Sequence, residues 1–158
     1  MSAPVKLYSW VALLLVLHLL LHVGFAYGTG APDLLTLALL LAAREVGLGR
    51  AAVLGLFFGL LEDALSVLAF GANSIAMTLV AVGGALSRDF FVGDSRIFLV
   101  SYVFAGKWIR DLIHWIAMGE GLRQPFWEQV LVQGALQSLY VAAIALVLSV
   151  VVGLGNES

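Results

Sequence analysis

Charged and titratable side chains interrupt two long apolar segments of this chain, and this feature restricts the fold more than any other. The two segments are 50–70 and 97–118, and the residues are Glu62, Asp63, Lys107, Arg110, Asp111 and His114. An ionised side chain at the centre of a bilayer costs about 2.5–3.5 kcal/mol on insertion scales, so such groups face the protein interior and pair there. We therefore expect these side chains to meet inside a bundle of helices.

The composition indicates an integral membrane protein. Hydrophobic residues make up 62% of the 158 residues, charged residues make up only 11%, and the mean hydropathy is +1.05. Soluble domains carry about 25% charged residues. A formal net charge of −2 offers no basic surface for nucleic acid, and the absence of cysteine excludes disulfides and thiolate metal sites. We expect one domain embedded in a lipid bilayer.

Six apolar segments have lengths suited to helices in a hydrocarbon core, which needs about 20 residues per crossing. The expected helices cover residues 8–26, 32–46, 50–70, 74–87, 97–118 and 128–152. The first segment lacks a small-residue cleavage site, so we expect a retained helix and not a signal peptide. Pro32 suits the first position of the second helix, with Asp33 at its positive end, and Gly71 suits a left-handed turn that ends the third. The expected fold class is an all-α membrane protein with six transmembrane helices.

The distribution of basic residues predicts the orientation of this bundle. With six crossings, both termini lie on one side. The basic residues on that side are Lys6, Arg44, Arg50, Arg88 and Arg96, whereas the opposite side carries only Arg123. Cytoplasmic loops carry the excess of Lys and Arg, so both termini are expected inside the cell.

This orientation places the charged residues of both segments in the middle and outer half of the membrane. Lys107, Arg110, Asp111 and His114 follow a spacing of three and four residues, which puts them on one helical face. Formal charges of +1 on this face and −2 at Glu62 and Asp63 nearly cancel, as pairing requires.

Two histidines, His18 and His22, lie one helical turn apart in the outer half of the first segment. Histidines at this spacing can ligate zinc, but neither an HExxH motif nor an evident third ligand accompanies them. Interior histidines or partner contacts are the favoured interpretation.

Glycines at helical spacing indicate close helix packing. Gly55 and Gly59 form a GxxxG pattern, and Gly83 and Gly84 offer a second small surface. Such patterns let another helix approach closely. The partner is either another helix of the bundle, which we favour, or a second copy in a homodimer.

Two interpretations of the charged residues remain open. They form an ion-pair network that stabilises the bundle, an outward-facing polar pocket that receives a ligand or a segment of another protein, or both. Because buried ion pairs are an inefficient way to gain stability compared with apolar packing, we favour the pocket.

Several short motifs resemble the rod shape-determining MreD family. The resemblance covers mainly residues 32–90. The motifs are Pro32-Asp33-Leu34-Leu35, then Gly55 to Gly59 followed by Leu60-Leu61-Glu62-Asp63-Ala64-Leu65-Ser66, then Gly71-Ala72-Asn73-Ser74. The charged residues of segment 97–118 match no motif of this family, so their role depends on the physical argument alone.

The resemblance implies a non-enzymatic subunit of the bacterial inner-membrane machinery for side-wall peptidoglycan synthesis and rod shape. It implies MreC as the direct partner, with MreB, RodA and a class B transpeptidase in the same complex, and no cofactor. The family is similar in fold to the substrate-binding subunits of energy-coupling-factor transporters, which are six-helix proteins with an outward-facing pocket. The expected site for the membrane-proximal segment of MreC comprises His18, His22, Asp33, Glu62, Asp63, Asn73, Lys107, Arg110, Asp111 and His114.

Two further functions compete with this expectation. A binding subunit of a transporter would hold a vitamin-like small molecule in the same pocket, since buried charges also mark transport pathways. Enzyme activity is not expected, because no nucleophile and base are recognisable and because Glu62 and Asp63, as helix neighbours, point about 100° apart.

Overall fold

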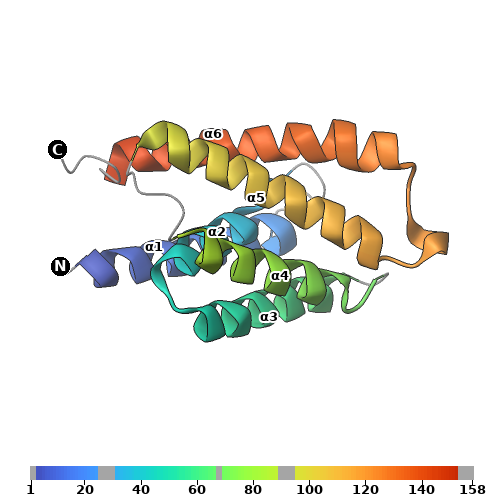
Figure 1. Ribbon diagram of the computed structural model, residues 1–158, viewed down its shortest axis with the longest axis horizontal. Helices are drawn as coiled ribbons and strands as arrows, with labels where there is room; N and C mark the ends of the chain where they lie inside the picture. Colours follow the sequence, from blue (N-terminus) through green and yellow to red (C-terminus); the bar gives the residue numbers. More distant parts are fainter. Residues whose placement is uncertain (1–2, 25–30, 67–68, 89–94, 153–158) are drawn as a thin grey trace.

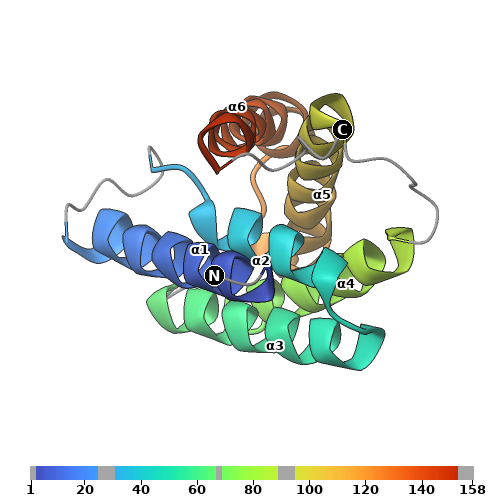
Figure 2. The same cartoon turned by 90° about the vertical axis from the view of Figure 1, so that its left-hand side faces the viewer.

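The computed structural model describes residues 3–24, 31–66, 69–88 and 95–152, and all regular structure in these ranges is helical. The helices are α1 (Ala3–Leu19), α2 (Leu34–Glu45), α3 (Leu48–Leu65), α4 (Ala72–Ser87), α5 (Arg96–Ala117) and α6 (Ala135–Val152). Two π-helical segments, Leu20–Gly24 and Trp127–Gly134, extend α1 and precede α6, and a 3-10 turn covers Glu120–Leu122. The start of α1 and the end of α6 lie at the same end of the molecule (Figure 1), and Figure 2 views that end.

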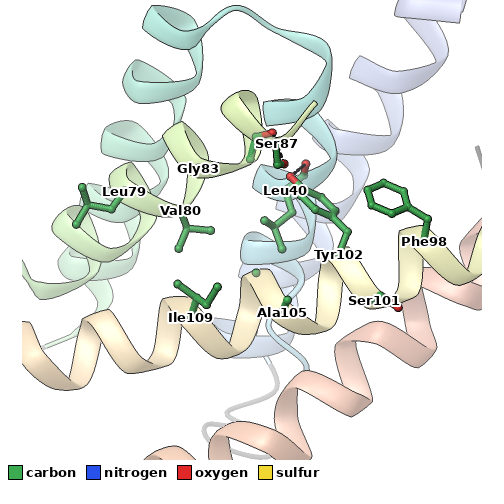
Figure 3. A pocket seen from close by; sticks show the side chains of 12 residues that line it. Leu40, Leu79, Val80, Gly83, Ser87, Phe98, Ser101, Tyr102, Ala105 and Ile109 are labelled. Atoms are coloured by element: carbon green, nitrogen blue, oxygen red, sulfur yellow. Dashed lines mark hydrogen bonds between the residues drawn. The ribbon is translucent and has the colours of Figure 1, made fainter. Parts of the chain in front are cut away.

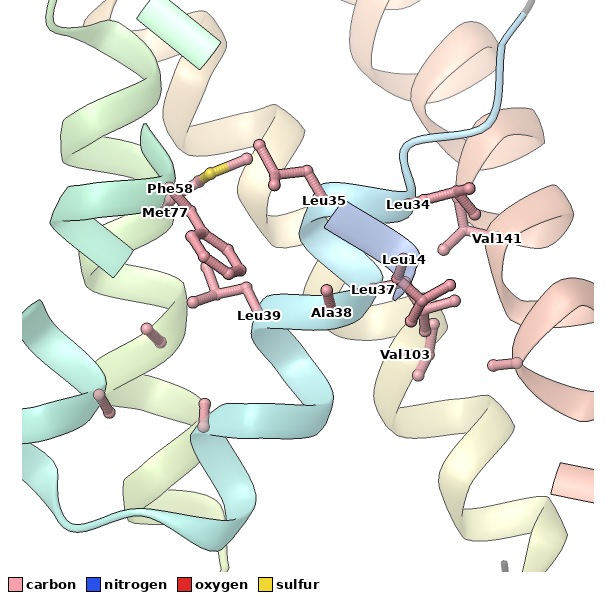
Figure 4. Packing of buried hydrophobic residues seen from close by; sticks show 14 of the residues in the cluster. Leu14, Leu34, Leu35, Leu37, Ala38, Leu39, Phe58, Met77, Val103 and Val141 are labelled. Atoms are coloured by element: carbon pink, nitrogen blue, oxygen red, sulfur yellow. The ribbon is translucent and has the colours of Figure 1, made fainter. Parts of the chain in front are cut away.

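Helix α2 forms the centre of the bundle. It contacts α1, α3, α4, α5 and α6, and Figures 1 and 2 show α3 on one side of it and α5 and α6 on the other. Every residue from Leu34 to Leu40 is buried. Figure 4 shows Leu39 pointing toward Phe58 and Leu34 pointing toward Val141. A helix that is apolar all round is buried in this way.

The helix boundaries correct three details of the sequence prediction. Helix α2 begins at Leu34 with Asp33 as its N-cap, so Pro32 precedes the helix and does not occupy its first position. Helix α3 ends at Leu65 and not at residue 70, because Ser66 is extended. Gly71 is left-handed, with φ +96°, but it caps the start of α4 and does not end α3. The early end of α3 brings the side chain of Asp63 to the first residues of α4.

The GxxxG glycines pack inside the bundle, as one of the two alternatives predicted. A Cβ on Gly55 would lie 2.6 Å from the carbonyl oxygen of Met77, and a Cβ on Gly59 would lie 2.7 Å from the backbone nitrogen of Ser74. Both glycines therefore let α3 approach the backbone of α4 closely.

The two glycines of the second pair, Gly83 and Gly84, differ in their packing. A Cβ on Gly84 would lie 2.5 Å from the hydroxyl of Tyr102 and 3.2 Å from the Cβ of Ala43, so this glycine is needed for packing. A Cβ on Gly83 would meet no atom within 4 Å. The prediction that Gly83 packs within the bundle is therefore wrong, because its face of α4 is turned toward open space, and packing against a second copy stays a prediction.

One described helical stretch, Trp127–Val151, is long and apolar enough to cross a membrane by itself, and Tyr8–His22 and Ala72–Ser87 are shorter apolar helices. Helix α3 carries Arg50, Glu62 and Asp63, and α5 carries the charges of the second segment, which lowers their apolar character. The five helices around α2 expose large apolar side chains, for example Leu13, Leu56, Leu79, Ile109 and Leu139.

Candidate functional site

Side chains from five helices meet in one polar cluster inside the bundle. The polar cluster comprises His18 of α1, Asp33 at the start of α2, Glu62 and Asp63 of α3, Asn73 of α4, and Lys107, Arg110 and Asp111 of α5. The predicted convergence of the two charged segments is thus observed. Lys107 and Asp63 are each 1% exposed, so both point into the protein.

Helix α5 supplies both cations of the polar cluster. The Nζ of Lys107 lies 2.6 Å from each carboxylate oxygen of Asp111, one turn away, and 3.5 Å from Asp33. The Nη1 of Arg110 donates to Asp111 at 3.1 Å and lies 4.0 Å from Asp33. The prediction of a shared helical face holds for these three residues of α5, and Asp33 joins them from α2.

Asp33 is held at the N-terminus of α2 as well as by the cations. Its carboxylate accepts hydrogen bonds from the backbone N–H of Thr36 at 2.9 Å and from the Thr36 hydroxyl at 2.7 Å. The first N–H groups of a helix lack partners within the helix, and an N-cap carboxylate satisfies them and interacts favourably with the helix dipole. The sequence prediction of Asp33 at the positive helix end is confirmed.

Asp63 caps a different helix from the one that carries it. Its carboxylate accepts hydrogen bonds from the backbone N–H of Asn73 at 3.1 Å, and from the backbone N–H and hydroxyl of Ser74 at 3.0 and 2.6 Å. The side-chain oxygen of Asn73 in turn accepts a hydrogen bond from Arg110. Asp63 is therefore linked to the α5 cations through Asn73.

Glu62 connects the polar cluster to α1. Its Oε2 lies 3.1 Å from the Nε2 of His18, which is fully buried, and its Oε1 lies 4.0 Å from Arg110. The His22 ring stacks on His18 at 4.1 Å, and the His22 Nδ1 donates to the His18 carbonyl. Within the described ranges, no group of three or more His, Cys, Asp or Glu side chains is placed to hold a metal ion.

His114 lies at the edge of the polar cluster, one turn beyond Arg110 on α5. It is half-buried. Its ring makes no hydrogen bond within the part of the chain that the structure describes. It belongs to the surroundings of the polar cluster and not to its hydrogen-bonded interior.

The members of the polar cluster share one level along the helices. At about 1.5 Å per residue, Glu62 lies about 18 Å along α3 from Arg50, and Lys107 lies about 17 Å along α5 from Arg96. Helix α2 is 12 residues long and begins next to Asp33. The two shorter helices, α2 and α4, thus begin at the level where the long helices carry their charges.

The polar cluster holds more carboxylates than cations. Among the described residues, four carboxylates, Asp33, Glu62, Asp63 and Asp111, lie near two cations, Lys107 and Arg110. Each helix N-terminus contributes the equivalent of about +0.5 charge. With neutral imidazoles, the polar cluster therefore keeps a net negative character of about one charge.

Limited access to the polar cluster remains through its carboxylates. The exposed side-chain fractions are 13% for Asp33, 14% for Asp111 and 20% for Glu62. Two buried nitrogens, the Nε of Arg110 and the Nδ1 of His18, have no hydrogen-bond partner within the described residues. The site therefore has unused hydrogen-bonding groups as well as unbalanced charge.

Sequence reasoning did not find the capping partners Thr36 and Ser74. Their signal was present, because Thr36 follows Asp33 by three residues and Ser74 follows the left-handed Gly71 at a helix start. Caps of this kind need an acceptor at one end of a helix, and for α4 that acceptor comes from α3, which local sequence alone does not reveal.

A separate apolar cavity of about 440 Å³ lies between α4 and α5, with Leu40 of α2 at its floor (Figure 3). Its lining includes Leu79 and Gly83 from α4, and Tyr102 and Ile109 from α5. We call this space the apolar cavity. The sequence prediction placed its pocket at the charged residues and did not foresee this one.

Comparison with models of protein families, with curated proteins and with solved structures finds no match to this chain.

Proposed function

We propose that the chain is a non-enzymatic, multi-pass subunit of the bacterial plasma membrane, of the MreD type, that binds the membrane-proximal segment of MreC. The observation that carries this proposal is the convergence of Asp33, Asp63 and Asn73. These residues come from three separate motifs of the family resemblance, yet they meet the cations of α5 in one polar cluster. A shared site would give the three motifs a common functional role.

The exposed surface supports a position inside the bilayer. Large apolar side chains are exposed on the five helices around α2, whereas soluble monomers rarely expose contiguous apolar patches larger than a few hundred Å². In this proposal all six helices lie in the membrane with both termini inside. Helix α2, about 18 Å long, is too short to cross a core of about 30 Å. Its N-terminus would lie within the bilayer, where the Asp33 carboxylate accepts hydrogen bonds that water would otherwise accept.

The chemistry of the polar cluster favours a guest that brings positive charge or N–H donors to Asp33, Glu62 and Asp111. The guest would also offer a carbonyl to the unpartnered Nε of Arg110. A bound segment of MreC with these groups would be stabilised in one conformation over others, which is sufficient to bias the shape of MreC outside the membrane. MreB, RodA and a class B transpeptidase would act in the same machinery.

The test compares two Glu→Gln variants of the full-length protein. Glu62 lies in the polar cluster, and Glu128 is exposed at the start of the helical stretch that leads into α6. Each variant is co-expressed with a tagged MreC and captured in mild detergent. We expect Glu62→Gln to lower the captured amount about tenfold, as the loss of a charged hydrogen bond of about 1.5 kcal/mol would do, and Glu128→Gln to leave it unchanged.

Thermal unfolding of both variants controls for loss of fold. Equal capture of MreC by the wild type and by stable Glu62→Gln would contradict the proposal. Mass spectrometry of the purified wild type separates the runner-up function. A polar small molecule retained by the protein, without binding of MreC, would support a transporter binding subunit.

A further inference from the structure

We propose that the apolar cavity between α4 and α5 binds one acyl chain of an anionic phospholipid, with the lipid headgroup beside Arg44. This inference depends on the proposed position in the membrane, but not on MreC. It concerns a different part of the molecule from the polar cluster.

The lining of the apolar cavity selects hydrocarbon. Most of its surface comes from aliphatic side chains and glycines (Figure 3). Two of its hydroxyl groups are already used within the protein: Ser87 donates to the carbonyl of Gly84 at 2.9 Å, and Tyr102 donates to the carbonyl of Leu40 at 3.0 Å. A polar ligand would find few partners here, because those hydroxyls are engaged with backbone carbonyls.

The apolar cavity opens sideways, between the two helices. Leu79 and Gly83 on the α4 side are exposed, and so are Ser101, Ala105 and Ile109 on the α5 side. A sideways opening on helices that lie in a bilayer faces lipid. An unfilled space of this size would leave its lining without dispersion contacts on one side, which favours entry of an acyl chain from a neighbouring lipid.

The volume argues against a helix as the occupant. A helix about 10 Å across occupies about 420 Å³ for each turn of about 5.4 Å. The apolar cavity, at about 440 Å³, would therefore receive only a short part of a helix. A single flexible hydrocarbon chain can fill such a space along its length.

Charge marks one end of the apolar cavity. The guanidinium of Arg44 lies 5.1 Å from the ring centre of Phe98 and 5.4 Å from that of Tyr102, and both rings line the cavity. In the proposed orientation this end faces the cytoplasm, whose leaflet carries the anionic lipids. An acyl chain in the cavity would place its phosphate near this guanidinium.

The experiment uses spin-labelled lipids in vesicles of phosphatidylcholine that contain the full-length protein. The probes are phosphatidylglycerol and phosphatidylcholine, each labelled on the acyl chain, and electron spin resonance measures the immobilised fraction. We expect the wild type to immobilise labelled phosphatidylglycerol about fivefold more strongly than labelled phosphatidylcholine. A preference of this size is the effect of one arginine near a membrane surface. Arg44→Gln should reduce this preference to near one.

Gly83 provides the matched pair of cavity variants. Because a Cβ at Gly83 meets no atom within 4 Å, Gly83→Leu should fill the mouth without disturbing the fold, whereas Gly83→Ala leaves most of the space. We expect Gly83→Leu to lose the immobilised lipid and Gly83→Ala to keep it.

Equal immobilisation by the wild type and a stable, inserted Gly83→Leu would overturn the lipid proposal. If Gly83→Leu lost MreC and kept its lipid, the cavity would instead receive a side chain of the partner. Because MreC capture by Glu62→Gln is read separately, failure of the lipid proposal is distinguishable from failure of the proposed function.

Discussion

The polar cluster and the apolar cavity lie along the same pair of helices, α4 and α5, but they are built in opposite ways. In the polar cluster, Asp63 accepts from the backbone of α4, Lys107 lies against Asp33 of α2, and Arg110 donates to Asn73 of α4, so these contacts hold the helices together. At the apolar cavity, small residues such as Gly83 of α4 and Ala105 of α5 line the interface and leave space. In the proposed membrane position, buried charges require partners from neighbouring helices and so close a helix interface, whereas missing side-chain volume leaves the interface open to lipid.

Removal of a cation from the polar cluster should have the largest effect on stability. Lys107→Met leaves Asp111 and Asp33 with uncompensated buried charge, and we expect it to lower the free energy of unfolding by about 3–5 kcal/mol. Unfolding in mixed micelles measures the loss. The double variant Lys107→Met with Asp111→Leu should recover most of it, and a loss that adds up independently would show that the two residues do not interact.

Removal of the carboxylate of Asp63 should have the next largest effect. Asp63→Ala leaves two backbone N–H groups and the Ser74 hydroxyl without an acceptor at the start of α4, and about 3 kcal/mol of stability should be lost. Asp63→Asn keeps an acceptor and should lose less. The same unfolding assay measures both, and an unchanged stability of Asp63→Ala would show that α4 does not need this cap.

Substitution of a packed glycine should destabilise the protein less than loss of a buried charge. Gly59→Ala brings a methyl group within 2.7 Å of the backbone of α4, and overpacking of this kind costs about 1–3 kcal/mol. The same unfolding assay should register this loss. A neutral effect of Gly59→Ala would contradict the close contact between α3 and α4.

The smallest expected effect is a gain. Gly83→Ala adds a methyl group to a helix at a position with no neighbour within 4 Å, and the higher helix propensity of Ala should stabilise the protein by up to about 1 kcal/mol. A loss of stability in the same unfolding assay would show that Gly83 packs against another helix after all.

The approximate positions of the helices followed from the sequence, because apolar segments separated by Gly, Pro and charged residues allow few other helix assignments. The convergence of the charges in segments 50–70 and 97–118 also followed, since the cost of burial requires partners. The boundaries at Pro32, Ser66 and Gly71 did not follow. At Pro32 the N-cap is the next residue, Asp33, and at Gly71 a cap from α3 sets the start of α4.

The apolar cavity could not be predicted. Gly83-Gly84 and Ala105-Gly106 are both pairs of small residues, but the sequence does not say which member faces another helix. In the structure Gly84 packs against Tyr102 and Gly106 lies against Leu40, while Gly83 faces open space. The difference depends on the rotation of each helix about its axis, which is set by tertiary packing.

The most direct test of the account measures capture of MreC by two folded variants in one experiment. One variant is Glu62→Gln in the polar cluster, and the other is Gly83→Leu at the mouth of the apolar cavity. The account predicts that MreC is lost with Glu62→Gln and retained with Gly83→Leu. Retention of MreC by Glu62→Gln together with its loss from Gly83→Leu would contradict it.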